Sequence, residues 1–469
     1  MKTYQDLQIV TARQRTADII DFVKQVINDH KGSERYDEAL TAYAYDRQKN
    51  TTIINYQKLL YTMSGEAVPD NFSANYKLCS NYFNRFITQE NQFLLGNGIT
   101  WTKEETATRL GDKFDTAIQK AGRDSLIGGT AFGFWNLDHV DVFDLLEFAP
   151  LFDEEDGAMK AGVRFWQIAA DKPLRATLYE MDGYTDFIWN KRDEAGNKDA
   201  SGQVLHEKRP YKLKVRVSEA DGEQIFDGEN YPSFPIVPLY GNPHKQSELV
   251  GRREQIDAYD LIKSGFAGDI DDASQIYWTL QNAGGMDDID LVKFIEHMKT
   301  VKAAVVSDDA KAESHTLEVP FESREAILNR LRTDLYDDFM ALNTKEIVGG
   351  ATTATQIIAA YDPLQKKTDL FEYQVREFID GLLNVAGIDD VPTFTRDVII
   401  NTTEEIQALM QSATYLSADY VTEKVLTLLG DKDKVPEVLK EMQEDDIDRL
   451  PVTNNQEEEG GNEDEVPGL

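Results

Sequence analysis

The spacing of apolar residues predicts a helical N-terminal region. Between residue 1 and about residue 60, charged positions alternate with apolar positions at helical intervals. Two further helices are expected at about 75–98 and 102–129, because each run ends at glycines. The N-terminal apolar stripe consists of Ile19, Ile20, Phe22, Val23 and Ile27.

The pattern changes from about residue 130 to about residue 240. Short aromatic and β-branched runs replace the helical period there, which is typical of strands. Turn signals separate these runs at Asp156-Gly157, Asp182-Gly183 and Asp221-Gly222. We therefore predict a β-rich insert over about 130–240.

After Pro243 the helical period returns. One apolar stripe predicts a helix at 247–275, and a second predicts one long helix over 321–346, roughly 35–40 Å in length. The first stripe consists of Ile256, Tyr259, Ile262, Phe266 and Ile270. The second consists of Ile327, Leu331, Leu335, Phe339 and Leu342.

The remaining segments complete a mainly helical α+β prediction. A compact segment with a short helix and a strand is expected at about 279–320. A helix is expected at 353–387, in which Pro363 should kink or interrupt the run. The segment 451–469 is acidic and is expected to be disordered. Three short helices precede it, near 403–415, 418–429 and 435–447.

Net charge restricts the possible partners. The 469 residues include 84 acidic and 49 basic side chains, which give a formal net charge of −35. Such a balance argues against a large surface that grips nucleic acid and against binding to an anionic membrane. The hydrophobic fraction of 41% is ample for sizeable cores, so the chain is not a disordered protein.

Cysteine and histidine usage gives no catalytic or thiolate metal centre. Cys79 is the single cysteine, which excludes an intrachain disulfide, and we interpret it as a buried, inert thiol on an apolar helix face. The six histidines are scattered and form no HExxH or HxH pair. We find no signal peptide and no apolar window of membrane-spanning length, so cytosolic synthesis is expected.

Two motifs suggest phosphate or metal chemistry. The loop VGGATTATQ contains a Gly-Gly pair before a helix, but no lysine follows and a helix precedes it, so it does not fit a nucleotide P-loop. Two aspartate clusters, at 269–272 and 287–290, could hold divalent cations. Neither has the EF-hand spacing, and a solvated helix face is the simpler interpretation.

The order of these parts resembles one family, the portal proteins of tailed bacteriophages, especially the siphophage type from Gram-positive hosts. A Pro-rich strand ends in a small polar turn and leads into a helix, within FPIVPLYGNPHKQSELVGRREQIDAYDLIKSGFAGDIDDASQIYW. The segments NYFNRFITQENQFLLGNGITW, GGTAFGFWNLD and AGVRFWQI are similar to family elements upstream. VGGATTATQIIAAYDPLQKK is similar to a downstream element, although Thr-Thr stands where bulkier or basic residues often occur. The resemblance covers roughly 35–390.

The resemblance implies a map of the chain as a portal fold. Residues 1–246 would form the wing, with the β-rich insert inside it. The helices at 247–275 and 321–346 would form a two-helix stem, and 276–320 a small α/β clip. Residues 347–353 would be the tunnel loop, 354–399 the connecting helices between wing and crown, and 400–450 the helical crown, followed by the acidic tail.

The resemblance also implies a function without catalysis or cofactors. The chain would form a ring, usually a dodecamer, at the capsid vertex of the virion, assembled in the host cytoplasm. Double-stranded DNA would pass through its channel during packaging, retention and ejection. The further partners would be the terminase large subunit, a head-tail adaptor or connector protein, and the major capsid and scaffolding proteins, with no membrane involved.

Two groups of residues are candidates for contact with DNA. The tunnel-loop group consists of Lys345, Val348, Gly349, Gly350, Thr352, Thr353 and Gln356. The acidic stem surface consists of Asp257, Asp260, Asp269, Asp271, Asp272, Glu322 and Glu325. An acidic wall would repel the duplex and keep its contacts weak, because phosphate attraction produces tight, non-specific binding.

Two alternatives remain open at this point. The first is a metal-dependent nuclease or phosphoryl-transfer enzyme that uses Asp269, Asp271 and Asp272. The second is an acidic DNA mimic or adaptor that binds a basic protein. The two long paired helices do not require the second alternative.

Overall fold

A computed structural model describes most of the chain, in two units. The described residues are 2–62, 64–71, 73–190, 202–217, 224–273, 277–281, 311–315, 320–345, 354–396, 402–429, 431 and 434–448. Unit 1 comprises 1–343 and 361–397, and unit 2 comprises 344–360 and 398–469. No helix within the described ranges is long and apolar enough to cross a membrane.

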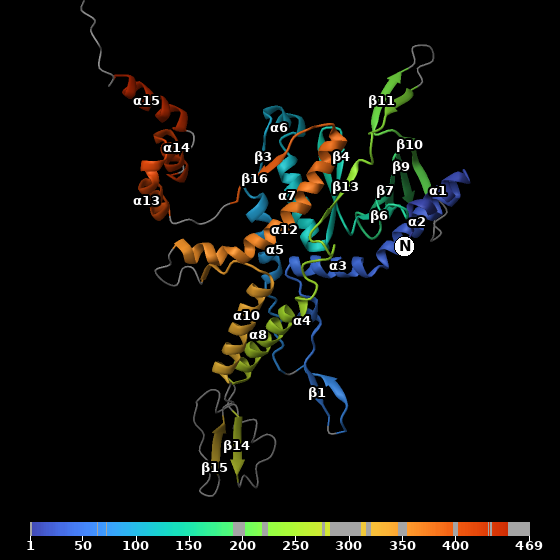
Figure 1. Ribbon diagram of the computed structural model, residues 1–469. Coiled ribbons are helices and arrows are strands. Elements are labelled where there is room, and N and C mark those ends of the chain that lie inside the picture. Colours follow the sequence, from blue (N-terminus) through green and yellow to red (C-terminus); the bar gives the residue numbers. More distant parts are fainter. Residues whose placement is uncertain are drawn as a thin grey trace, which may run out of the picture. The chain divides into compact units, whose positions relative to one another are not determined.

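Unit 1 begins with helices, as the N-terminal pattern predicts (Figure 1). Phe22, Val23 and Ile27 of the predicted stripe are buried against a sheet, and Ile19 and Ile20 pack at its edge. The helix α7 ends at the predicted Gly-Gly pair, where Gly129 has a φ of +83° that favours glycine. These helices are α1 (Tyr4–Ala12), α2 (Thr16–Lys31), α3 (Glu34–Asp46), α4 (Thr51–Asn55), α5 (Tyr82–Leu95), α6 (Glu104–Leu110) and α7 (Phe114–Gly128).

The β-rich insert is confirmed. It contains a five-stranded antiparallel sheet in the order β10-β9-β8-β7-β6, and a three-stranded sheet in the order β13-β4-β5. The turns at Asp156-Gly157 and Asp182-Gly183 join antiparallel neighbours as predicted, whereas Asp221-Gly222 lies outside the described residues. The strands of the two sheets are β4 (Thr130–Asn136), β5 (His139–Asp144), β6 (Phe148–Phe152), β7 (Met159–Trp166), β8 (Leu174–Glu180), β9 (Gly183–Trp189), β10 (Gln203–Arg209) and β13 (Ile236–Tyr240).

Four two-stranded pairings complete the β structure within the described ranges. One of them joins residues far apart in the sequence, because Ile99 in β3 pairs with Phe394 in β16. Another lies in the segment predicted as compact, where β14 pairs with β15; the short helix and strand expected between them lie outside the described residues. The paired strands are β1 (Leu59–Tyr61), β2 (Ala67–Pro69), β3 (Ile99–Trp101), β11 (Lys212–Val217), β12 (Gln224–Glu229), β14 (Tyr277–Gln281), β15 (Lys311–His315) and β16 (Pro392–Phe394).

The helices α8 (Arg253–Ala273) and α10 (Phe321–Asp338) pack against each other. Their apolar stripes are buried only at one end: Ile256 and Leu335 are in the main core, whereas Ile270 and Ile327 are 45% and 48% exposed. The pair is therefore anchored in the body near Ile256 and Leu335. Its other end presents apolar side chains to solvent.

The helix α10 is shorter than predicted. It ends at Asp338 rather than at 346, since Met340 adopts a left-handed φ of +51° and the Ala341 N–H donates to the Tyr336 carbonyl. Phe339 and Leu342 are nevertheless buried. The apolar spacing thus continues through a turn whose side chains still face the core, and this is why the pattern overestimates the helix.

The helix α12 (Ala354–Ala386) continues through Pro363, so the predicted interruption is wrong, and the predicted kink stays a prediction. Pro363 is exposed, where water can bond the carbonyl group that proline leaves without a donor. Within unit 1, the buried residues Leu364, Phe371 and Val375 provide packing on one face of the helix. This burial offsets the loss of one backbone hydrogen bond.

Unit 2 contains the three predicted C-terminal helices, in which α14 packs with both of the others. The acidic tail lies outside the described residues, so its predicted disorder stays a prediction. The helices are α13 (Thr402–Ser412), followed by the short 3-10 helix Ala413–Tyr415, α14 (Ala418–Leu429) and α15 (Val435–Asp448).

Candidate functional site

The junction between the α8–α10 pair and the rest of unit 1 holds two of the acidic residues singled out in the sequence, Asp257 and Asp260. Here Phe339, just after α10, packs on Phe86 of α5 with ring centroids 4.6 Å apart. Tyr336 of α10 packs edge-on against the same ring at 5.1 Å. The aromatic contacts fix α10 to α5, and the polar contacts described next fix α8.

Two of the predicted acidic surface residues are not on the surface. Asp260 is fully buried and accepts a hydrogen bond from the Ser80 backbone N–H at 2.8 Å and another from Asn50 Nδ2. Burial raises the pKa of the Asp260 carboxyl, and these hydrogen bonds oppose that shift. Asp260 therefore fastens α8 to the segments around α4 and α5, and its assignment to an acidic stem surface is wrong.

Asp257, one turn earlier on α8, is held in the same way. Its side chain is 14% exposed and lies 3.5 Å from Arg253 Nε. Thr52 Oγ1 donates to it at 2.6 Å, and the Tyr45 hydroxyl donates to its other oxygen. Most of its hydrogen-bonding capacity is therefore used inside the protomer.

The other predicted acidic positions lie farther along the pair. Asp269 forms an ion pair with Arg324 across the two helices. Asp271, Glu322 and Glu325 are exposed, and the Asp272 side chain lies outside the described part of the structure. Among the described residues, no three His, Cys, Asp or Glu side chains are grouped so that they could hold a metal ion.

A buried cluster of charges joins three parts of the chain and was not predicted. Lys367 Nζ of α12 lies 2.6 Å from Glu90 Oε2 of α5 and 2.9 Å from Glu248 Oε2. Arg252 contacts the same Glu248 oxygen at 3.0 Å, and Asn242 Nδ2 donates to the other. The cluster thus connects α12, α5 and the segment that leads into α8.

Burial shifts the proton affinities of this cluster. It raises the pKa of Glu90 to about 7, against the attraction of Lys367 and with the repulsion of Glu248. Burial also disfavours charge on Glu248, but Lys367 and Arg252 outweigh it and hold the pKa of this carboxyl below its usual value. Glu90 is therefore the member of the cluster that changes charge near neutral pH.

Local sequence patterns could not reveal the cluster, because its members are far apart in the sequence. The one available signal is Lys367 itself. It stands three residues after Leu364 and four before Phe371, both of which are buried, so it interrupts an apolar stripe. A lysine in such a position requires a buried partner.

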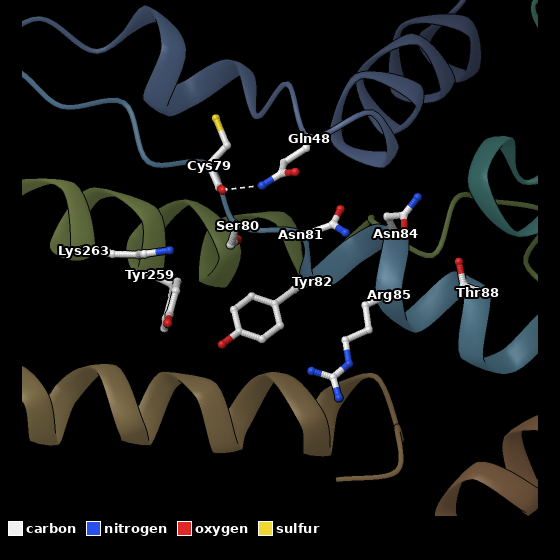
Figure 2. A pocket seen from close by; sticks show the side chains of 10 residues that line it. All are labelled: Gln48, Cys79, Ser80, Asn81, Tyr82, Asn84, Arg85, Thr88, Tyr259 and Lys263. Carbon is white, nitrogen blue, oxygen red and sulfur yellow. Dashed lines mark hydrogen bonds between the residues drawn. The ribbon is translucent and has the colours of Figure 1, made fainter. Parts of the chain in front are cut away.

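A pocket of about 530 Å³ opens beside this junction (Figure 2). Tyr82 of α5 packs edge-on against Tyr259 of α8 with centroids 5.1 Å apart, and burial raises the pKa of Tyr82. Arg85 extends from α5 to the same side as Tyr82, and Lys263 comes from α8. The pocket is therefore lined by cations and tyrosines, in a chain that is strongly acidic.

Cys79 lies at the rim of this pocket, and its prediction is corrected. It is half-buried and precedes α5 rather than lying on a helix face. Its carbonyl accepts a hydrogen bond from Gln48 Nε2 at 2.9 Å (Figure 2). The apolar spacing around it continues into α5, and this explains the mistaken helical assignment.

The predicted tunnel loop falls largely outside the described residues. Lys345 and Gln356 are described, and both are exposed. The other members of this group, Val348, Gly349, Gly350, Thr352 and Thr353, lie outside the described residues. The loop therefore remains a prediction.

Comparison with known proteins gives consistent matches. A portal protein of Clostridium phage phiCD119 is 29% identical over 200 residues, which cover 40% of this chain and 44% of that relative. A portal protein of Bacillus phage SPP1 is 24% identical over 389 residues, 76% of this chain and 74% of that relative. The chain thus spans less than half of the first relative and about three quarters of the second.

Among solved structures, the neck of an empty GTA particle has a TM-score of 0.43 at 11% identity, and the match covers 74% of this chain and 90% of that chain. The family model described as phage portal protein, SPP1 Gp6-like, matches residues 25–450. That range includes α8, α10, the β-rich insert and the buried charge cluster. The chain belongs to the SPP1 Gp6-like family of phage portal proteins.

Proposed function

We propose that this chain assembles into a ring at the capsid vertex and that double-stranded DNA enters and leaves through the channel of this ring. The observation that carries the proposal is the family match over residues 25–450. Membership of this family makes the chain a structural component rather than an enzyme. The nuclease alternative is therefore wrong, and the acidic adaptor is superseded.

The proposed stem is the α8–α10 pair. It is supported by the packing of the two helices and by the ion pair of Asp269 with Arg324. Asp271, Glu322 and Glu325 remain candidates for an acidic stem surface, because they are exposed. The net charge of −35 per copy would keep a sliding duplex from binding tightly.

The remaining assignments belong to the same proposal. Residues 1–246, which include the β-rich insert, would be the wing, 276–320 the clip, and 400–450 the crown. A dodecameric ring would assemble in the host cytoplasm and become part of the virion. It would bind the terminase large subunit, a head-tail adaptor or connector protein, and the major capsid and scaffolding proteins.

Ring formation is tested with the purified full-length chain. Negative-stain microscopy should show rings with a central channel, and mass photometry should give their copy number. A chain that stays monomeric at all salt and protein concentrations would contradict the proposal. A phage that lacks its own portal gene and carries this one should package DNA.

The role of the tunnel loop in DNA packaging is tested by introducing negative charges into it. The double variant Thr352→Asp/Thr353→Asp should assemble into rings but package at most about a tenth of the DNA, since carboxylates at a constriction repel phosphates at short range. The matched control is Thr352→Val/Thr353→Val, which keeps size and adds no charge. DNA filling by the aspartate variant at the level of the valine control would remove the loop from the mechanism.

A further inference from the structure

The pocket of Figure 2 is lined by two cations, Arg85 and Lys263, and a third cation, Arg332, shares the ring of Tyr336 with Arg85. Arg85 and Arg332 both lie over the ring of Tyr336, at 5.5 and 5.8 Å from its centroid. Lys263 lies 6.0 Å from the ring centroid of Tyr259. Within the described part of the chain, none of these three cations forms an ion pair. They are held in place by aromatic rings, with their charges available to another molecule.

A second pocket, of about 550 Å³, has the opposite charge. Its rim carries Glu34 and Asp37 from the first turns of α3 and Glu254 from α8. All three are exposed, and none forms an ion pair with a described residue. The one arginine in this rim, Arg253, is already engaged by Asp257 and Tyr45.

The two pockets face opposite sides of the same helix. Lys263 lines the basic pocket and Glu254 lines the acidic pocket. The two residues are separated on α8 by about two and a half turns at 3.6 residues per turn, and the extra half turn places them on opposite sides of the helix. They also lie near opposite ends of α3, because Gln48 follows that helix and Glu34 begins it. One protomer thus presents a basic surface on one side and an acidic surface on the other.

This arrangement meets the requirement of a closed ring. In a cyclic assembly of more than two copies, each subunit uses two different surfaces, which must be complementary to each other. We propose that the basic pocket of one copy receives the acidic rim of the next copy, with Arg85 and Lys263 facing Glu34, Asp37 and Glu254. The proposal rests on ring formation by the portal and names the surfaces that mate.

A copy of this chain fits the pocket better than nucleic acid does. Carboxylates are abundant on every copy, since acidic residues outnumber basic ones by 84 to 49. Arginine and lysine that gripped phosphate would hold a moving duplex through salt-dependent contacts, which conflicts with sliding. The concave shape and the aromatic floor suit a fixed protein contact.

Charge reversal tests the pairing in the full-length protein. The variants Arg85→Glu/Lys263→Glu and Glu34→Lys/Asp37→Lys should each raise the concentration at half-assembly about tenfold or more, because like charges then face each other. Mass photometry and sedimentation velocity measure this concentration, and circular dichroism with thermal melting verifies folding. Combining all four changes in one chain should restore assembly, because opposite charges face each other again.

Matched controls lie on α2, away from both pockets. Lys24 and Asp21 are exposed and form no ion pair with a described residue. Lys24→Glu and Asp21→Lys change the net charge at each site in the same directions as the test variants and should leave the half-assembly concentration unchanged within about twofold. A similar loss of assembly in these controls would assign the effect to net charge and overturn the proposal.

Cross-linking identifies the contact directly. A carbodiimide joins lysine amines to carboxylates at contact distance, so wild-type rings should give a Lys263–Glu34, Lys263–Asp37 or Lys263–Glu254 peptide. When isotopically light and heavy copies are mixed before assembly, some cross-links should join a light peptide to a heavy peptide, because the two residues belong to different copies. Cross-links found only within one copy would contradict the pairing.

The outcomes separate this inference from the proposed function. Normal rings from both reversed variants overturn the pairing and leave the portal function intact. Normal rings that lose DNA retention in Arg85→Glu/Lys263→Glu assign the pocket to phosphates, which also overturns it. Failure of the wild-type chain to form rings contradicts the portal function itself.

Discussion

Lys366 and Lys367 are neighbours on α12, yet they lie in opposite environments. Lys366 Nζ is 2.6 Å from Asp362 Oδ2, and the two side chains are 67% and 55% exposed. Lys367 Nζ is also 2.6 Å from a carboxylate, that of Glu90, but these side chains are 11% and 3% exposed. Two ion pairs of the same length therefore show what burial does to an ion pair.

The exposed pair is weak because water and salt screen it, and such pairs contribute about 0–1 kcal/mol. The buried pair must first overcome the loss of hydration of both ions, so its net contribution is also small. The difference appears when one partner is removed, because a buried charge is then left uncompensated. Lys367 thus stabilises one arrangement of α12, α5 and the segment that leads into α8. Lys366 contacts only a carboxylate in its own helix turn.

The largest predicted effect is the loss of Lys367. Lys367→Met keeps the aliphatic packing and leaves Glu90 and Glu248 buried, with Arg252 as the one cation that still pairs with Glu248 among the described residues. We expect the free energy of unfolding to fall by about 3–5 kcal/mol. Urea unfolding followed by circular dichroism measures this change.

Lys366→Met is the matched control for that experiment. It removes an exposed ion pair on the next residue, so the free energy of unfolding should change by no more than about 0.5 kcal/mol. Equal losses from the two variants would show that burial does not separate these lysines.

The pH dependence of Glu90 gives the next effect. Its pKa is raised to about 7 in the folded protein, so the native state holds a proton that the unfolded chain releases near pH 4.5. The free energy of unfolding should therefore decrease as pH rises from about 5 to 8, by about 3 kcal/mol for this group. The quantity to measure is the difference between wild type and Glu90→Gln, because other buried carboxyls, such as Asp124 with a pKa of about 6, shift in the same direction.

Glutamine at residue 90 mimics the protonated carboxyl and should remove this part of the slope. The exposed Glu105 supplies the control, since wild type minus Glu105→Gln should not change with pH. A wild-type-minus-Glu90→Gln difference that is constant between pH 5 and 8 would show that Glu90 is ionised throughout.

The sequence predicts the elements of this fold better than their ends. Periodicity identifies the N-terminal helices, the β-rich insert and the three C-terminal helices, because each buries one regular face. It misplaces the end of α10, because Phe339 and Leu342 keep helical spacing while the backbone turns at Met340. It misplaces Cys79 for the same reason, in an extended segment before α5.

The candidate site is less accessible to sequence reasoning. From the sequence, Asp257 and Asp260 are expected to be solvated positions on an acidic helix. The neighbouring residues in the sequence do not show that Ser80 and Asn50 approach from elsewhere in the chain. Lys367 and its partners are separated by more than a hundred residues. Such contacts depend on tertiary packing, which composition and spacing do not encode.

The smallest predicted effect on stability applies the same comparison, between a buried and an exposed carboxylate, to α8 and α10. Asp260→Asn places an amide NH₂ beside Asn50 Nδ2 or the Ser80 N–H, both of which are donors that need an acceptor. An unsatisfied buried donor costs about 1–3 kcal/mol, so we expect a loss near 2 kcal/mol in the free energy of unfolding. Glu325→Gln on the exposed side of α10 makes the same chemical change and should cost less than about 0.5 kcal/mol.

Because Asp260 fastens α8 to the body, hydrogen exchange should also become faster at the N–H of Ser80 in Asp260→Asn and stay unchanged in Glu325→Gln. Unchanged exchange at Ser80 in both variants would mean that Asp260 is not what holds α8 in place.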